Sequence, residues 1–189
     1  MGKRILVQRR GRGTPTFRAP THRRLGPSVY PPMTQRMESG SMAGSIKAIV
    51  HDPGRGTPLA QIRLEDGAEY RVVATEGMFE GGEVKLGRFA PVGIGNVLPL
   101  GIIPEGTIVS NVELSPGDGG RLIRSSGTYG IVSTHTERGT SVKLPSGSIV
   151  TLNDQCRATL GVVSAGGRTD KPFLKAGSKL HLMRARGRK

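Results

Sequence analysis

Residues 115–130 read SPGDGGRLIRSSGTYG. Five glycines, one proline and two arginines leave this stretch few side chains that could build a core, although strand-like sequence flanks it on both sides. Glycine adopts backbone conformations that other residues avoid, and its missing side chain lets a ligand approach the backbone closely. We therefore interpret the stretch as a loop-rich connection between two sets of strands, with arginines placed on it to contact an anion.

Short runs of β-forming residues occur on both sides of this connection. Before it they occupy residues 44–52, 58–66, 68–77, 80–87, 96–102 and 106–114; after it they occupy 130–137, 140–147, 148–154 and 156–166. Turn sequences such as Asp52-Pro53-Gly54 and Asp66-Gly67 separate the runs. Spacing of this kind is typical of sandwiches and barrels. The sequence therefore predicts an all-β protein of two tandem small barrels, with no helix longer than a turn or two.

The positive charge of the chain is concentrated at its two ends. The formal net charge is +14 over 189 residues, of which residues 1–40 carry +8, residues 41–165 carry −1 and residues 166–189 carry +7. We predict a basic N-terminal extension over 1–40, barrels over 41–114 and 115–165, and a basic C-terminal extension over 166–189. A fold gains nothing from like charge gathered at both ends, so this layout indicates an external polyanion.

Both extensions lack the pattern of a self-sufficient fold. The first has no helical or alternating period and is interrupted by prolines and glycines. In the second, Lys171, Lys175 and Lys179 could line one side of a helical turn, whereas Arg184 and the residues after it alternate with small residues as an extended strand would. We expect the extensions to acquire their shape only on docking.

Motifs for catalysis, metals and membranes are missing from the sequence. No phosphate-binding loop is present, the four histidines are scattered, and Cys156 is the single cysteine, which we expect to be a small buried hydrophobe. The longest apolar run, VLPLGIIP, is too short for a membrane span, and the N-terminus lacks the apolar run of a signal peptide. We expect an intracellular protein with no catalytic residue, metal or cofactor.

The polyanion that fits this sequence best is RNA. Membrane-surface segments need a wide apolar face and groove-reading DNA modules usually need a recognition helix, and neither extension supplies one. Small β-barrels with Arg- and Gly-bearing loops suit folded RNA, which proteins contact through phosphates, ribose hydroxyls and shape. Aromatic residues make up only 4% of the chain. Contacts with the RNA backbone should therefore outnumber base stacking.

Four segments resemble a known family. PGDGGRLIRSSGTYG (116–130), VKLPSGSIVTL (142–152) and CRATLGVVSAGG (156–167) are similar to the universal large-subunit ribosomal protein two family, and GKRILVQRRGRGTPTFRAPTHRR (2–24) resembles its archaeal branch. The resemblance spans nearly all 189 residues. It implies an OB-like barrel followed by an SH3-like barrel, with extended termini that penetrate large-subunit ribosomal RNA.

The same resemblance implies a function and partners. The expected role is that of a structural, cytoplasmic constituent of the large ribosomal subunit that supports subunit association, tRNA placement and organisation of the peptidyl-transferase region. Its implied partners are large-subunit rRNA, other large-subunit proteins and the small subunit at the interface. The family continues beyond MRARGRK into a Gly/His-rich extension, whereas this sequence stops at Lys189 and His181 does not occupy that motif. We therefore expect no enzymatic activity.

Candidate RNA contacts are the basic residues of the extensions and the residues of the glycine-rich loops. Arg55 and Arg124 match family positions associated with RNA contact, and the backbone N–H groups of Gly119 and Gly120 could cradle a phosphate. The full predicted set is Lys3, Arg4, Arg9, Arg10, Arg12, Arg18, His22, Arg23, Arg24, Arg55, Gly119, Gly120, Arg121, Arg124, Ser125, Gly127, Thr128, Arg157, Arg168, Lys171, Lys175, Lys179, Arg184, Arg186, Arg188 and Lys189.

Two other functions remain open at this point. A free-standing regulatory RNA-binding protein with the same barrels would need exposed stacking aromatics on one sheet. A small hydrolase with a glycine-rich loop is a more distant alternative, and turnover that survives Arg124→Ala and deletion of the extensions would favour it.

Overall fold

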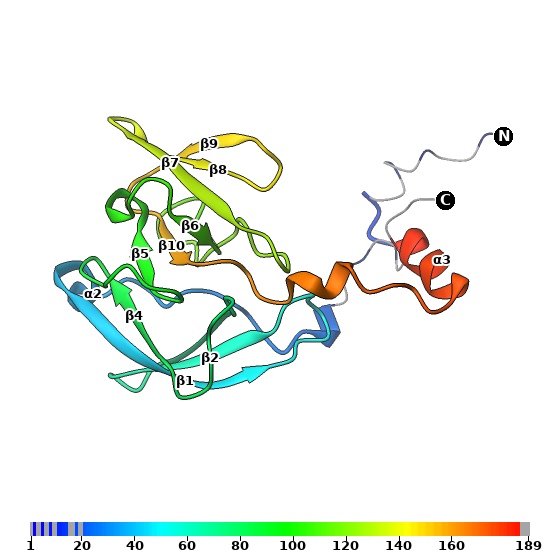
Figure 1. Cartoon of the computed structure of the whole chain (residues 1–189), viewed down its shortest axis with the longest axis horizontal. Helices are drawn as coiled ribbons and strands as arrows, with labels where there is room; N and C mark the ends of the chain where they lie inside the picture. The colour runs from blue at the N-terminus through cyan, green and yellow to red at the C-terminus, as the bar shows by residue number, and fades with distance from the viewer. Residues whose placement is uncertain are drawn as a thin grey trace.

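The computed structural model describes residues 2, 5, 8, 11–14, 18 and 21–185. Strands dominate the regular structure (Figure 1). The strands are β1 (Ser41–Val50), β2 (Leu59–Leu64), β3 (Glu69–Val73), β4 (Glu83–Gly87), β5 (Val97–Pro99), β6 (Ile108–Ser110), β7 (Gly130–Thr136), β8 (Gly139–Lys143), β9 (Ile149–Leu152) and β10 (Arg157–Leu160). The helical segments are η1 (Thr21–Arg23), α2 (Gln35–Ser39), η2 (Leu100–Ile102), η3 (Gly166–Thr169) and α3 (Ala176–Ala185). The predicted all-β class is confirmed.

The strands form one series in the order β3-β2-β1-β4-β5-β10-β6-β7-β8-β9. Neighbours pair antiparallel, except that β4 and β5 meet in parallel at Leu86 and Val97. The series is open, with β3 at one end and β9 at the other. Strand β10 lies between β5 and β6, although it is the last strand along the chain. It therefore joins the two halves of the sheet.

Alternation along the strands explains which residues enter the interior. In β1, Met42, Gly44 and Ile46 are buried, whereas Ser41, Ser45 and Lys47 are exposed. Successive side chains of a strand point to opposite faces, so this pattern places one face of β1 inward. A register shift between Ile46 and Ala48 interrupts the pairing with β2. Residues 51–58 then connect the two strands and carry Arg55 on the loop.

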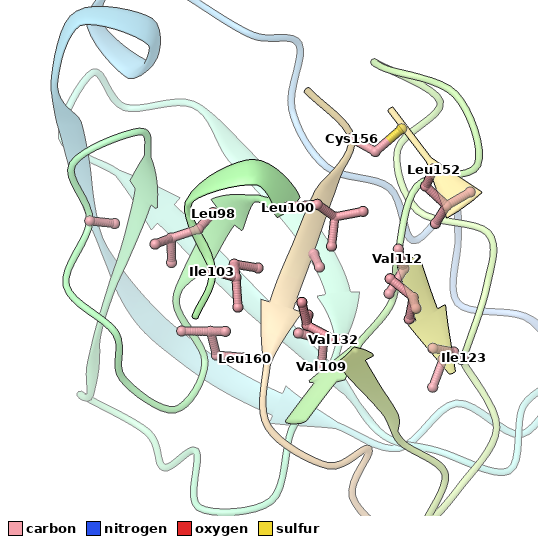
Figure 2. Close-up of a cluster of buried hydrophobic side chains, with 13 residues drawn as sticks. Leu98, Leu100, Ile103, Val109, Val112, Ile123, Val132, Leu152, Cys156 and Leu160 are labelled. Carbon is pink, nitrogen blue, oxygen red and sulfur yellow. The ribbon is translucent and has the colours of Figure 1, made fainter. Parts of the chain in front are cut away.

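Two large clusters of buried side chains stabilise the two halves of the sheet, and a third, small cluster consists of Leu59, Val73 and Val163. We call the two large clusters the first core and the second core. The first core consists of Tyr30, Met37, Met42, Ile46, Ala60, Ile62, Leu64, Val72, Ala74, Val84, Leu86 and Val97. The second core, shown in Figure 2, consists of Ala90, Leu98, Leu100, Ile103, Val109, Val112, Ile123, Val132, Val142, Leu152, Cys156, Ala158 and Leu160. The predicted burial of Cys156 is confirmed, and every residue of β10 is buried.

The later part of the predicted N-terminal extension packs against the strands. Tyr30 and Met37 belong to the first core, with 4% and 1% of their surfaces exposed. The backbone N–H of Tyr30 donates to the carbonyl oxygen of Gly119 at 3.0 Å. A segment without its own hydrophobic period can still be ordered when single apolar side chains fill gaps in a core built by strands. The expectation that residues 1–40 acquire shape only on docking is therefore wrong for the segment around Tyr30 and Met37.

The C-terminal segment contains a helix that is longer than the turn or two expected from the sequence, and this helix includes Arg184, where the sequence favoured an extended strand. Helix α3 spans Ala176–Ala185 and includes Arg184. It lies away from the sheet, at the right of Figure 1. The alternation around Arg184 was misleading because small residues such as alanine also favour a helix. Over the part of the chain that the structure describes, no helix is both long and apolar enough to cross a membrane.

Candidate nucleic-acid interface

Four arginines from four separate segments line one cavity of about 350 Å³. We call this cavity the arginine pocket. Arg24 comes from the N-terminal segment, Arg55 from the loop between β1 and β2, Arg124 from the loop before β7, and Arg168 from η3. The remaining lining residues are Gly56, Thr57, Val73, Ser125 and Ser126. The pocket thus combines both ends of the chain with loops from both halves of the sheet.

Arg55 is held by a carboxylate on its own loop. Its Nη1 pairs with Oδ2 of Asp52, and its Nη2 donates to the carbonyl oxygen of Gly26 at 3.0 Å. The Asp52 side chain is fully buried and also accepts the N–H of Gly54 at 3.0 Å. Burial opposes ionisation of Asp52, but the hydrogen bonds from Gly54 and Arg55 together lower its pKa. Asp52 is therefore ionised at neutral pH and fixes the direction of the Arg55 side chain.

Arg124 is fixed by two backbone carbonyls. Its Nη1 donates to the Gly120 oxygen at 2.8 Å, and its Nη2 donates to the Ser28 oxygen at 2.6 Å. The pKa of Arg124 is lowered, first by burial and then by the nearby charges of Arg55 and Arg24. Among the described residues no carboxylate forms an ion pair with it. The guanidinium is oriented by these two carbonyls and forms no direct ion pair within the described structure.

Two glycines of the β1–β2 loop allow Arg24 and Arg168 to approach the loop closely. A Cβ atom at Gly54 would lie 2.5 Å from Cγ of Arg24, and one at Gly56 would lie 3.0 Å from Nε of Arg168. Arg168 also donates from Nε and Nη2 to Oγ of Ser126, both at 3.2 Å. The two glycines that flank Arg55 therefore leave the space that the Arg24 and Arg168 side chains occupy.

The charge balance of the pocket favours an anion. Within the described structure, only Arg55 of the four arginines has a carboxylate partner. Like charges gathered in a partly desolvated site repel one another, so an anion that enters the pocket relieves this repulsion. The planar guanidinium also matches the oxygens of a phosphate in pairs of parallel hydrogen bonds. The pocket is thus suited to a phosphate group.

A larger cavity of about 690 Å³ has a different character. Its charged lining residues are Glu38, Asp154, Arg88 and Arg157, and they lie together with apolar residues such as Met33 and Ile102. Such mixed charge does not select a polyanion. No three His, Cys, Asp or Glu side chains among the described residues lie close enough together to hold a metal ion.

Arg157, a predicted RNA contact, is buried in an internal ion pair. Its side chain is 5% exposed, and Nη2 pairs with Oε1 of Glu113 at 2.7 Å. Nη1 donates to the carbonyl oxygen of Pro31 at 2.7 Å. Arg157 follows Cys156 into the central strand β10, and a charge there requires an internal partner. This internal ion pair gives no support to direct contact of Arg157 with RNA, which stays a prediction.

Gly119 and Gly120 are also committed inside the protein. The N–H of Gly119 donates to Oε1 of Glu113, and that of Gly120 donates to Oδ1 of Asp118, both at 3.0 Å. Both glycines are buried. Carboxylates of the chain already accept these two N–H groups, so the structure gives no support to a phosphate cradle here, and RNA contact at the two glycines stays a prediction.

The loop that carries Arg124 is itself well anchored. Thr128 donates from Oγ1 to the carbonyl oxygen of Ser125 at 2.6 Å, and the N–H of Gly127 donates to Val163 at 2.9 Å. Ser125 lines the arginine pocket. A Cβ atom at Gly127 would lie 2.5 Å from Cα of Gly166, so this glycine lets the loop approach the segment that bears Arg168.

Other predicted contacts are spread outside the pocket. Those that are described and exposed are Arg12, Arg18, His22, Arg23, Arg121, Lys171, Lys175, Lys179 and Arg184. Those that lie outside the described residues are Lys3, Arg4, Arg9, Arg10, Arg186, Arg188 and Lys189. For both groups, RNA contact stays a prediction.

Sequence reasoning missed three residues that shape the site. Asp52 could have been found, because an acid three residues before an arginine in the turn DPGR is well placed to pair with it. Ser126 lies beside the predicted residues, but its partner Arg168 is 42 residues away. Glu113 gave no local signal, because Arg157 is 44 residues away.

Exposed aromatic side chains do not gather on a sheet. In the described part of the chain Phe79, Phe89, Tyr129 and Phe173 are between 45% and 69% exposed. All four lie outside the strands. Their placement gives no platform on which successive bases could stack. The feature expected of a free-standing regulatory RNA-binding protein is therefore missing from the described residues.

Comparison with known proteins accounts for almost the whole chain. Residues 3–85 match the family described as Ribosomal Proteins L2, RNA binding N-terminal domain, and residues 93–188 match Ribosomal Proteins L2, C-terminal domain. The large ribosomal subunit protein uL2 of Methanothermobacter thermautotrophicus is 50% identical over 189 residues, which cover 100% of this chain and 78% of the relative.

Other archaeal relatives give the same result. The uL2 protein of Haloarcula marismortui is 50% identical over 190 residues, covering 100% of this chain and 78% of that protein. That of Thermofilum pendens is 46% identical over 187 residues, covering 98% and 75%. With two consecutive family matches and these relatives along its length, the chain belongs to the large ribosomal subunit protein uL2 family, in its archaeal form.

Proposed function

We propose that the arginine pocket is where the chain holds the phosphate backbone of large-subunit rRNA. The chain is a structural protein of the large ribosomal subunit in the cytoplasm, and its family is not enzymatic. The observation that carries the proposal is that four guanidinium groups converge on one cavity while a single carboxylate, that of Asp52, pairs with one of them.

The origin of the four arginines supports backbone contact over base reading. Each comes from a different segment, so the pocket forms only when the loops and both ends of the chain meet. Phosphate contacts position a protein on RNA without reading its sequence. The exposed basic residues around Arg12, Arg23 and Lys175 would extend this contact along the RNA. Other large-subunit proteins and the small subunit are further proposed partners.

We propose that the two halves correspond to an OB-like unit over 41–114 and an SH3-like unit over 115–165. The first and second cores support two units, and the second core draws Leu98 and Val109 from residues 41–114 as well as Val132 from residues 115–165, so strands β5 and β6 pack with the second unit. The hydrogen-bonded strand order is open, with β3 at one end and β9 at the other. Closure of each barrel would therefore depend on side-chain packing rather than on hydrogen bonds around the whole barrel. Support of subunit association, of tRNA placement and of the peptidyl-transferase region would follow from the position of the chain in the subunit.

Salt-dependent binding tests the proposed function. The full chain is titrated against an in vitro transcript of the large-subunit rRNA of Methanothermobacter thermautotrophicus at KCl concentrations between about 50 and about 200 mM. Arg124→Ala should weaken binding by about tenfold or more, because a charge-assisted hydrogen bond to phosphate is lost. It should also reduce the slope of log affinity against log salt by about 0.7 to 0.9.

Arg138→Ala is the matched control. Arg138 is exposed at the tip of the β7–β8 hairpin, so this substitution removes the same charge as Arg124→Ala but outside the pocket. Its replacement should change affinity by less than about twofold, as expected for a distant surface charge. Equal effects of Arg124→Ala, Arg168→Ala and Arg138→Ala would mean that the pocket is not the phosphate site.

A further inference from the structure

The carboxylate of Glu113 is enclosed by donors from two directions. The side chain is fully buried. Oε1 accepts the N–H of Gly119 at 3.0 Å and Nη2 of Arg157 at 2.7 Å, while Oε2 accepts the backbone N–H of Arg157 at 2.8 Å. Glu113 therefore ties the loop at Gly119 to strand β10.

Arg157 extends this link to the N-terminal segment. Its Nη1 donates to the Pro31 oxygen at 2.7 Å, and its guanidinium carbon lies 5.2 Å from the centre of the Tyr30 ring. The N–H of Tyr30 donates in turn to the Gly119 oxygen at 3.0 Å. The loop at Gly119 and the segment at Tyr30 are thus held to each other and to the same buried ion pair.

These two anchored segments also supply both carbonyls that hold Arg124. Ser28 lies two residues before Tyr30, and Gly120 follows Gly119 directly. Their oxygens accept Nη2 and Nη1 of Arg124 at 2.6 and 2.8 Å. A shift of either segment would therefore move a carbonyl away from the guanidinium.

We propose that Glu113 and Arg157 are positioning residues for the arginine pocket. Neither lines it, and they act by fixing the Ser28 and Gly120 carbonyls that aim Arg124 at the bound phosphate. This role rests on the proposed function of the pocket. It gives Arg157 a part in RNA binding that is indirect and different from the direct contact predicted from the sequence.

A double-mutant cycle on the full chain tests the proposal. The variants are Glu113→Gln, Arg124→Ala and their combination, titrated against the same rRNA transcript at a temperature where circular dichroism shows every variant folded. Glu113→Gln should weaken binding about tenfold when Arg124 is present and less than about twofold in the Arg124→Ala background, because coupled residues are not additive.

A second variant separates positioning from stability. Replacing a buried ion pair by apolar residues of similar size often leaves stability unchanged or increased, so Glu113→Leu with Arg157→Met should fold cooperatively. It should still bind the transcript about tenfold more weakly and with a smaller salt slope, because the Gly119 and Pro31 contacts are lost. A merely structural ion pair would leave both the affinity and the slope of this folded variant at their original values.

The outcomes distinguish the two proposals. If Arg124→Ala binds as tightly as the original chain, the pocket is not the phosphate site and the proposed function fails. If Arg124→Ala weakens binding but Glu113→Gln adds the same factor in both backgrounds, the positioning role is overturned while the phosphate site stands. An unchanged affinity of the folded Glu113→Leu, Arg157→Met variant would likewise overturn the positioning role.

Discussion

The hydroxyl oxygen of Tyr30 lies 2.5 Å from the hydroxyl oxygen of Thr159, in the interior of the protein. The two residues are 129 positions apart in the sequence. The Tyr30 hydroxyl also donates to the carbonyl oxygen of Asn111 at 2.8 Å. Through this one side chain, a proline-rich segment near the N-terminus becomes part of the structure that joins the two cores.

Tyr30→Phe should lower the free energy of unfolding by about 1 to 3 kcal/mol, because it leaves the buried Asn111 oxygen and Thr159 hydroxyl without their partner. Guanidinium denaturation of the full chain measures the change. Tyr129→Phe is the control, since Tyr129 is 45% exposed and should change the unfolding free energy by no more than about 0.5 kcal/mol. Equal losses for the two variants would contradict the structural role of the Tyr30 hydroxyl.

Gly127→Ala should destabilise the protein more than Gly147→Ala. Both glycines have a left-handed backbone, with φ of 70° and 88°. Nothing lies within 4 Å of a Cβ at Gly147, whereas a Cβ at Gly127 would lie 2.5 Å from Cα of Gly166. We expect about 1 kcal/mol for Gly147→Ala from the backbone alone, and about 2 kcal/mol or more for Gly127→Ala, measured by denaturation.

The Gly127 variant should also affect RNA binding. Arg168 reaches the arginine pocket from the segment that includes Gly166. A side chain at Gly127 would push this segment away and so move Arg168 out of its position in the pocket. Affinity for the rRNA transcript should therefore fall for Gly127→Ala and not for Gly147→Ala. Similar losses of unfolding free energy for Gly127→Ala and Gly147→Ala would contradict the close contact between Gly127 and Gly166.

Acid should weaken the fold through Asp52. Its pKa is lower in the folded protein than the ordinary value of 3.8, so the folded state holds the ionised form more strongly than the unfolded state does. This stabilisation is complete above the unfolded pKa and is lost as the pH falls through the folded pKa. Below about pH 4, the original chain should therefore lose stability more steeply than Asp52→Asn. Parallel acid denaturation curves would contradict this prediction.

Cys156 should be unreactive in the native protein at about pH 8, where an ordinary thiol is partly ionised. Burial, followed by the charge of Glu113, raises the pKa of its thiol to about 11. A thiol reagent should therefore label the chain only after unfolding. Since the folded pKa exceeds the unfolded value of 9.0, stability contributed by the protonated thiol is lost as the pH rises between these values. Rapid native labelling would contradict the burial of Cys156.

The strands could be predicted because each carries its own signal. Residues 59–64 and 69–73 combine β-forming residues with a turn at Asp66-Gly67, and they pair as the sequence indicated. The order of the series could not be predicted in the same way. Pairing of β10 with β5 and β6 joins segments far apart in sequence, and short buried strands carry no mark of their partner.

The arginines of the pocket were predicted one by one but not as a group. Arg55 and Arg124 were selected for their glycine-rich surroundings and their family positions, and Arg24 and Arg168 for the charge of the extensions. Their convergence depends on long-range contacts, such as Arg168 with Ser126, which leave no local pattern. The same limit explains why the burial of Arg157 was not predicted, because only its distant partner Glu113 makes that burial tolerable.

Strand β10 connects the two halves of the sheet, and it is the last of the strands to be synthesised. Until residues 157–160 have been synthesised, β5 and β6 lack their shared neighbour, and Tyr30 lacks Thr159. The nascent chain therefore carries two unpaired flanks through most of its synthesis, in a form prone to association with other chains. Early shielding of these flanks, by a chaperone or by the RNA being assembled, would protect the chain until its last strand is in place.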